Sequence, residues 1–347
     1  MLARAPATKR ARPDCEREDQ RPTVLEVFAG AGGMALGLEQ AGLRHVALVE
    51  WDKHCVATLR RNGFKGVVHQ DARRVDYTAY TGVDVVAGGV PCQPWSMAGA
   101  HRGLADDRDM WPTAMRAVRE SRPRGFIFEN VAGIMRETFK DYFDGIVAGF
   151  YAMGYSVHVH LVDAADYGVP QHRKRMLMMG IRGVAWFQLP RPTSTRRTVR
   201  DALCDLGPPN GSNGHCKHAA SARQYKGHVG STMDKPSKAL VAGRHGQGGG
   251  SGMLREDSGA LRYFTLREQA RLQTFPDTYR LPSTWSHAVS MIGNACPPRL
   301  TQIFAAELLL WMPTDADQPR ASERAVSPSL RRAPPHDRRN NAAVATP

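Results

Sequence analysis

Long apolar runs are missing from this chain of 347 residues. No stretch approaches the roughly 18 apolar residues that a membrane-spanning helix needs, which argues against a membrane protein. The N-terminus leads into the basic Lys9–Arg12 without an apolar segment, so no secretory signal is expected. No CxxC pair occurs among the six cysteines, Cys15, Cys55, Cys92, Cys204, Cys216 and Cys296. We therefore expect a cytoplasmic protein without disulfides and without a metal site.

Acidic residues are also scarce relative to basic ones. Lys and Arg number 47 against 33 Asp and Glu, which gives a net charge of +14. This balance favours a polyanionic partner, with nucleic acid first. A basic surface that binds no polyanion is the alternative, since charge alone defines neither fold nor chemistry.

Apolar segments of strand type alternate with helical patterns in the first half of the chain. Strands are predicted at Val24–Phe28, His45–Val49, Val67–Val68, Val83–Ala87, Phe126–Phe128, Tyr155–Leu161 and Met176–Ile181. Such alternation, over about 160 residues, predicts an α/β fold with an open, mostly parallel sheet.

Beyond Pro190 the composition changes. Residues 191–260 are rich in Gly, Ser, Arg, His and Pro, which predicts a small, loop-rich second domain. Helices are predicted again at Thr265–Gln273 and across Leu300–Trp311. The polar ends of the chain, 1–22 and 313–347, are expected to be disordered.

The first predicted strand runs into a glycine-rich segment, Phe28–Gly33. Glycine lets the backbone turn sharply and approach a ligand closely, and Gly30–Ala35 fits the relaxed dinucleotide fingerprint GxGxxA. Glu50 ends the next strand, where an acid commonly accepts hydrogen bonds from ribose hydroxyls. These features predict a nucleoside-containing cofactor without choosing between NAD, FAD and S-adenosylmethionine; a tight structural turn is the alternative.

Two further side chains follow the second and third strands. Trp51 either stacks on an adenine or packs in the interior. Asp71 either accepts a hydrogen bond from an adenine amino group or caps a helix.

The loop Gly88–Ser96 carries a cysteine at the carboxyl edge of the sheet, where ligands bind in such folds. Because prolines and glycines flank Cys92, we interpret it as a nucleophile rather than a small buried residue. Glu129, after the strand Phe126–Phe128, is either an acid aimed at the same cleft or an N-cap. Alternation places Arg173 and Arg175 on one face, where they would lower the pKa of the thiol or hold a phosphate or carbonyl; a solvated basic turn is the alternative.

These motifs, in this order, resemble those of the cytosine-C5 DNA methyltransferases over residues 24–182 and 262–312. The resemblance is carried by Phe28–Gly33, Glu50-Trp51, Asp71, Pro91-Cys92-Gln93, Glu129-Asn130-Val131, Gln171–Arg175, Thr265–Glu268, Arg271–Pro276 and Gly293-Asn294. One departure is Cys296, where the family usually has valine, and we expect this residue to be part of the core.

The resemblance implies a Rossmann-like sheet of S-adenosylmethionine-dependent methyltransferases, formed by residues 23–190 and 288–312. It also implies a target-recognition domain and hinge at 191–287. Cys92 would add to C6 of a cytosine flipped out of duplex DNA, Glu129 would hydrogen-bond the ring, and Arg173 would lie beside its carbonyl oxygen, with Arg175 nearby and no metal. S-adenosylmethionine would be bound by Phe28, Ala29, Gly30, Gly32, Gly33, Glu50, Trp51, Asp71, Ala72, Pro91 and Asn294. DNA would be contacted by Gln93, Ser96, Arg244 and Gln247.

The same resemblance implies a monomer on double-stranded DNA in the nucleoid, functionally paired with a restriction endonuclease. Three alternatives stay open. A tRNA-methylating relative shares the catalytic residues, although the long Gly-rich insert favours DNA. An NAD-dependent oxidoreductase leaves Pro91-Cys92-Gln93 unexplained. The presence of Cys92, Glu129 and Arg173 argues against a regulator with a vestigial site.

Overall fold

The computed structural model describes residues 20–91, 108–193, 195–211, 214–216, 222–224, 229–243 and 249–313. The disorder predicted for the two ends of the chain concerns residues that lie almost entirely outside these ranges.

Ten strands and eight α-helices are formed by the described residues. The strands are β1 (Thr23–Val27), β2 (Arg44–Glu50), β3 (Val67–His69), β4 (Val85–Gly89), β5 (Gly125–Val131), β6 (Tyr155–Asp163), β7 (Lys174–Arg182), β8 (Ser231–Thr232), β9 (Met253–Arg255) and β10 (Leu261–Tyr263). The helices are α1 (Gly33–Gln40), α2 (Lys53–Arg61), α3 (Trp111–Ser121), α4 (Lys140–Ala152), α5 (Val199–Leu203), α6 (Leu266–Leu272), α7 (Trp285–Asn294) and α8 (Pro298–Trp311). Among these helices, none is long and apolar enough to cross a membrane.

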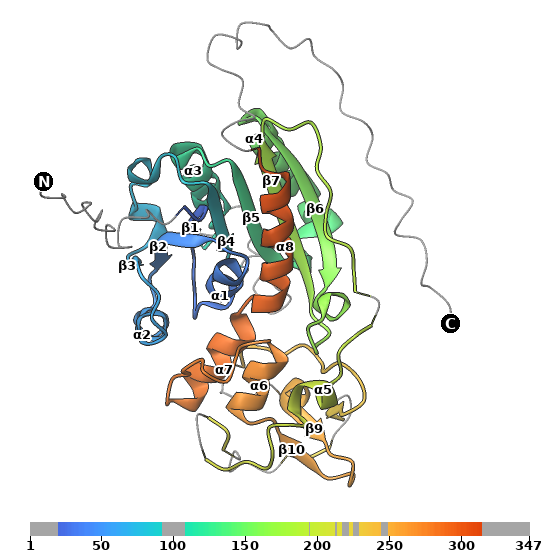
Figure 1. The fold of residues 1–347 in the computed structure, drawn as a ribbon. Coiled ribbons are helices and arrows are strands. Elements are labelled where there is room, and N and C mark those ends of the chain that lie inside the picture. The colour runs from blue at the N-terminus through green and yellow to red at the C-terminus, as the bar shows by residue number, and fades with distance from the viewer. Residues whose placement is uncertain are drawn as a thin grey trace, which may run out of the picture. The chain divides into compact units, whose positions relative to one another are not determined.

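Seven strands form one sheet in the order β3-β2-β1-β4-β5-β7-β6 (Figure 1). The pairs among β1, β2, β3, β4 and β5 are parallel, whereas β7 is antiparallel to both of its neighbours. The prediction of an α/β fold with a mostly parallel sheet is therefore confirmed. The strand order reverses beside β1, and in sheets of this kind ligands bind at such a reversal, outside the carboxyl ends of the strands.

Alternating side chains of the sheet form two separate cores. On one face, Leu25, Phe126 and Met178 pack with residues of α3 and α4. On the other face, Val24 and Ile127 pack with residues of α1 and α8, and α8 lies along the sheet in Figure 1. A strand exposes successive side chains to opposite faces, so one apolar run supplies both cores.

A third core joins the sheet to the loop-rich part of the chain. It combines residues of α1, α2 and β2 with residues of α5, α6 and α7. The described part of this region also holds the small sheet β10-β9-β8. Helices α5 and α7 are absent from the sequence-based prediction. A capping box between Thr198 and Asp201 was the available signal for α5.

Candidate active site

The described site candidates that follow β1, β2, β3, β4 and β5 lie at the carboxyl edge of these strands. Because these neighbouring strands are parallel, the segments that leave them emerge on the same edge. The part of this edge at β1, β2 and β3 carries residues expected to bind the cofactor. The part at β4 and β5 carries Glu129, the expected acid.

The turn after β1 has a left-handed backbone at three residues, two of which are glycines. Phe28 takes a φ of 58°, which ends the strand one residue earlier than expected, and Gly30 and Gly32 take φ values of 55° and 80°. A Cβ on Gly33 would stand 2.4 Å from the carbonyl oxygen of Cys296, whereas a Cβ on Gly30 would meet no atom within 4 Å. Gly33 therefore serves the packing of the turn, while Gly30 faces open space.

Glu50 holds this turn by its carboxylate. Its Oε2 accepts a hydrogen bond from Gly30 N at 2.7 Å, and its Oε1 accepts from Trp51 N at 2.9 Å and from Asp52 N at 2.8 Å. Burial raises the pKa of Glu50, and the backbone N–H groups oppose this shift. A carboxylate offers about four acceptor positions. The three bonds leave capacity for a hydroxyl, so the residues at this point fit a ribose.

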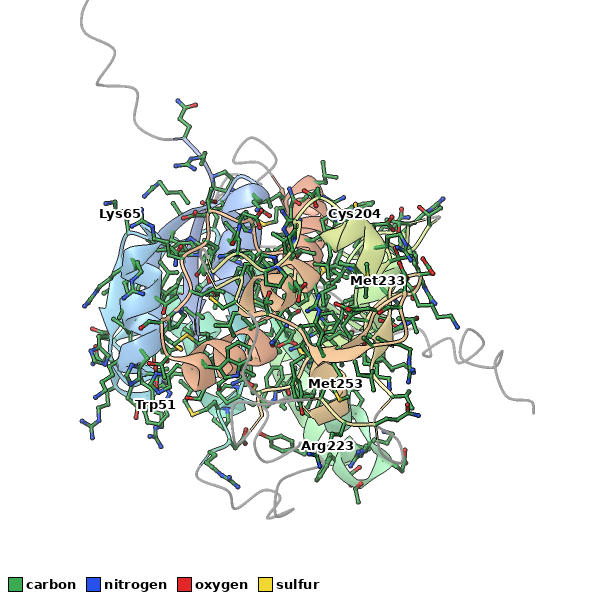
Figure 2. The ribbon with its side chains drawn as sticks, turned by 90° about the horizontal axis from the view of Figure 1, so that it is seen from below. Trp51, Lys65, Cys204, Arg223, Met233 and Met253 are labelled. Atoms are coloured by element: carbon green, nitrogen blue, oxygen red, sulfur yellow. The ribbon has the colours of Figure 1, made fainter. Side chains whose placement is uncertain are left out.

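Trp51 and Asp71 follow Glu50 at the same edge. Trp51 is 75% exposed, so the alternative of an interior packing residue is wrong; Figure 2 shows it at the periphery. Asp71 caps the short 3-10 helix η2 (Ala72–Arg74) and pairs with Arg73 at 2.6 Å. The capping alternative is thus observed, and the side chain of Asp71 is 27% exposed. Among the described residues, no cluster of His, Cys, Asp and Glu could hold a metal ion.

The second half of the edge lies where β4 and β5 end. Gly89 pairs with Glu129 in the sheet, and Val90 N donates to the Glu129 carbonyl oxygen at 3.0 Å. The described chain stops at the half-buried Pro91. Cys92 and the predicted DNA contacts Gln93, Ser96, Arg244 and Gln247 lie outside the described residues. The hydrogen bond from Val90 N thus holds the backbone of Glu129 against the segment that leads into Cys92.

Glu129 makes an ion pair with Arg175. The Nε atom of Arg175 lies 2.7 Å from Oε1 of Glu129, and both side chains are largely buried. Glu129 belongs to β5, so the N-cap alternative is wrong. The pair forms because β7 is antiparallel to β5 and Arg175 stands opposite Val131. A carboxylate held in place by a guanidinium at the end of a strand is suited to orient a polar ring through hydrogen bonds.

Arg173 occupies a different environment from the one expected. Its side chain is 1% exposed, and its guanidinium donates to the carbonyl oxygens of Leu240 at 2.9 Å, Gly293 at 2.7 Å and Ala295 at 3.0 Å. The expected place beside a substrate carbonyl is corrected to a place among backbone carbonyls. Of the two arginines, Arg175 pairs with Glu129, whereas the thiol on which both were expected to act, that of Cys92, lies outside the described residues.

A second buried side chain, that of Gln171, makes hydrogen bonds in the same region as Arg173. Gln171 donates to Leu272 O and to Gln273 Oε1, and it accepts from Leu240 N at 2.8 Å. Gln273 in turn donates to Ile292 O at 2.6 Å. The Gln171–Arg175 motif thus joins β7 to the loop-rich region and to α7. Asn294, a predicted cofactor ligand, is exposed at the end of α7, and both of its neighbours are held by Arg173.

We expect Arg173→Met to lower the free energy of unfolding by about 3–5 kcal/mol, because three buried carbonyls lose a charged donor. Urea unfolding of the variant and the wild type measures the difference. Arg182→Met, at the far end of β7, is the matched control and should cost far less. A stable Arg173→Met protein that has lost activity would instead place Arg173 at the substrate.

The Thr265–Pro276 motif supports the glycine-rich turn from the other side. Thr265 and Glu268 form a capping box that starts α6. Arg267 donates to Pro276 O at 2.9 Å and to Tyr279 O at 2.6 Å. The hydroxyl of Tyr279 donates to the carbonyl oxygen of Ala31. Tyr279 was missed by the sequence analysis, since its place at the turn depends on a contact across 248 residues.

Cys296 is a core residue, as expected. Its side chain is buried among residues of α8 and the sheet. Burial raises the pKa of its thiol to about 12. The thiol is therefore protonated and unreactive near neutral pH.

Comparisons with known proteins all indicate the same family. The sequence profile of the family described as "C-5 cytosine-specific DNA methylase" matches residues 23–309. The type II methyltransferase M.NgoMIV of Neisseria gonorrhoeae is 34% identical over 304 residues, covering 83% of this chain and 97% of the relative. The type II methyltransferase M.PspPI of Psychrobacter is 33% identical over 330 residues, covering 82% and 79%. The solved structure of the Entamoeba histolytica methyltransferase EhMeth matches with a TM-score of 0.69 at 15% identity, covering 84% and 98%, a likeness of fold.

Proposed function

Because this chain belongs to the C-5 cytosine-specific DNA methylases and is thus a DNA cytosine-C5 methyltransferase, we propose that it methylates a flipped cytosine through a covalent adduct to Cys92. The observation that carries the proposal is the Glu129–Arg175 pair beside the backbone that leads into Cys92. Cytosine C5 is too weak a nucleophile to take a methyl group unaided, so an activating group must be close to an acid.

Cys92 is the proposed activating group. Its thiolate bonds to C6 of the cytosine, and the electron pair of the C5–C6 double bond moves toward C5 and N3. Glu129 hydrogen-bonds N3 and the exocyclic amine and shares a proton with the ring, which stabilises the developing charge. Arg175 keeps the Glu129 carboxylate in place. C5 then accepts a methyl group from a sulfonium, which is left as a neutral thioether; C5 gives up its proton to water, and the Sγ–C6 bond breaks to regenerate the thiolate.

S-adenosylmethionine supplies that methyl group as a sulfonium when bound. We assign its ribose to Glu50, its adenine to Trp51, Asp71 and Ala72, and the remainder to Phe28, Ala29, Gly30, Gly32, Gly33, Pro91 and Asn294. Support comes from the remaining acceptor capacity of Glu50, the exposure of Trp51 and the open space at Gly30.

Residues 191–287 are the proposed target-recognition domain and hinge, with Arg244 and Gln247 as base-reading candidates and Gln93 and Ser96 beside the flipped base. Extruding a base costs a few kcal/mol, which contacts with the DNA must repay. The net charge of +14 favours phosphate contacts. We also propose that the protein acts as a monomer on chromosomal DNA and that a restriction endonuclease of the same specificity accompanies it, as the names of its type II relatives suggest.

Bisulfite sequencing of a heterologous host tests this function. We expect 5-methylcytosine at one fixed DNA sequence in cells that express the protein, and none at that sequence in cells with the empty vector. Sequencing tRNA from the same cells tests the alternative substrate. New methylation confined to tRNA would overturn the DNA assignment, and methylation of neither would overturn the proposed reaction.

A further inference from the structure

The turn that starts at Asp71 lies against the ribose-binding candidate. Glu50 pairs with His69 at the end of β3, and Gln70 N donates to the Glu50 carbonyl oxygen at 3.0 Å. His69 Nε2 lies 3.0 Å from the carbonyl oxygen of Trp51. The position of η2 (Ala72–Arg74) therefore determines the positions of Asp71 and Ala72, two of the residues proposed to bind the adenine.

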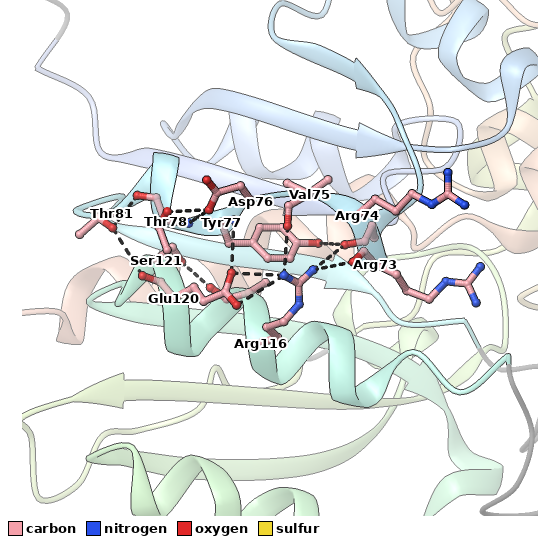
Figure 3. Close-up of polar contacts among 12 residues, drawn as sticks. Arg73, Arg74, Val75, Asp76, Tyr77, Thr78, Thr81, Arg116, Glu120 and Ser121 are labelled. Atoms are coloured by element: carbon pink, nitrogen blue, oxygen red, sulfur yellow. Dashed lines mark hydrogen bonds and ion pairs between the residues drawn. The ribbon is translucent and has the colours of Figure 1, made fainter.

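This short helix is held from outside by one guanidinium. Arg116 of α3 donates to the carbonyl oxygens of Ala72 and Arg73, both at 3.1 Å, and to that of Val75 at 3.1 Å. Figure 3 shows these contacts converging on the guanidinium. The last carbonyls of a helix have no partner within it, and a cation at this end satisfies them and complements the helix dipole.

Two neighbouring side chains fix the guanidinium itself. Glu120, one helical turn along α3, lies 3.3 Å from Arg116 and also accepts from Tyr77 N at 3.3 Å. The ring of the fully buried Tyr77 lies 4.8 Å from the guanidinium carbon, and its hydroxyl donates to Ala72 O at 2.8 Å. Arg116 is thus oriented by an ion pair, an aromatic face and three acceptors at once.

We propose that Arg116 is a positioning residue for cofactor binding, which sets the turn carrying Asp71 and Ala72 against the adenine of S-adenosylmethionine. This inference rests on the proposed cofactor site. Arg116 touches neither the cofactor nor the cytosine in this scheme. It acts on affinity for the cofactor and leaves the chemical step to the groups at β4 and β5.

Calorimetric titration with S-adenosylmethionine tests the inference. We expect Arg116→Met to raise the Kd about 10-fold, because the turn loses a charged donor to three carbonyls. Arg116→Lys keeps the charge but cannot form the planar set of contacts, so we expect an intermediate Kd. Arg119→Met, exposed on the same helix, is the matched control and should bind as the wild type does. At saturating cofactor, kcat of Arg116→Met should stay within about 3-fold of wild type, because the loss lies in ground-state binding.

A double-mutant cycle with Asp71→Asn separates this role from general destabilisation. If Arg116 acts through the turn, Asp71→Asn should weaken cofactor binding less in the Arg116→Met protein than in the wild type. Additive effects, or an unchanged Kd in Arg116→Met, would overturn the inference. Should Arg116→Met not fold, the same cycle is measured with Arg116→Lys. If the wild type does not bind S-adenosylmethionine, the proposed cofactor site is wrong, and this inference with it. If Glu50→Ala weakens cofactor binding but Arg116→Met does not, the cofactor site stands and only this inference is wrong.

Discussion

Cys92→Ser should lower the rate of methyl transfer by about 1,000-fold or more, because the serine hydroxyl is a far weaker nucleophile than a thiolate and gains no evident base. Binding of DNA and of S-adenosylmethionine should largely survive, since neither depends on the sulfur atom. Single-turnover assays with radiolabelled cofactor measure the rate, and fluorescence anisotropy measures the binding of DNA.

Trapping with fluorinated DNA identifies the nucleophile directly. DNA with 5-fluorocytosine at the target lacks the C5 proton whose loss permits elimination, so the wild type should remain bound under denaturing conditions. Cys92→Ser should form no such complex. Cys296→Ala is the matched control and should trap as the wild type does, because the Cys296 thiol is buried and its pKa is raised to about 12. Trapping by Cys92→Ser, or methylation near the wild-type rate, would show that Cys92 is not the nucleophile.

Glu129→Gln should lower kcat by about 100- to 10,000-fold, the range for loss of a positioned general acid or base. Glutamine keeps the size and hydrogen-bonding capacity of the side chain but cannot exchange a proton with the cytosine ring. It also leaves Arg175 without the carboxylate that lies 2.7 Å from its Nε atom. Steady-state kinetics on duplex DNA with saturating S-adenosylmethionine measures the effect.

Two comparisons make this result specific to Glu129. Glu137→Gln, exposed in the short helix η6 (Glu137–Phe139) after β5, changes the same chemical group away from the site and should leave kcat unaltered. Unfolding midpoints of both variants show whether the fold is intact. A folded Glu129→Gln enzyme with a kcat close to that of the wild type would remove Glu129 from the reaction.

The sheet was predictable because its strands are short apolar runs between helices of clear period. What such runs do not encode is direction. The pattern at Met176–Ile181 predicts a buried strand, yet nothing in it shows that β7 runs against β5. The sequence predicts a strand at Val83–Ala87, whereas β4 in the structure is Val85–Gly89. The side chain of Asp84 binds Thr23 N and Arg124 ahead of the strand, and the glycines continue the pairing with β5.

The division of labour between Arg173 and Arg175 was not predictable from their spacing. Arg173 immediately precedes β7 and Arg175 lies within it, and the sequence pattern assigns both to the site. Their surroundings come from elsewhere in the chain. The acceptors of Arg173 lie 67, 120 and 122 residues away, whereas Arg175 meets the end of β5. Residues such as Arg116 and Tyr279 escaped notice for the same reason, since their partners are carbonyl oxygens, which every sequence contains.

The reversed direction of β7 also limits how the length of this protein can change during evolution. Glu129 and Arg175 meet because β7 starts where β5 ends; a parallel β7 of nine residues would place Arg175 up to about 25–30 Å away, at the opposite edge. With the pairing of Met176–Ile181 kept, a one-residue insertion between Arg175 and Met176 would turn Arg175 to the other face of the sheet. Insertions and deletions should therefore accumulate within residues 191–260, while the start of β7 keeps its length across descendants of this gene.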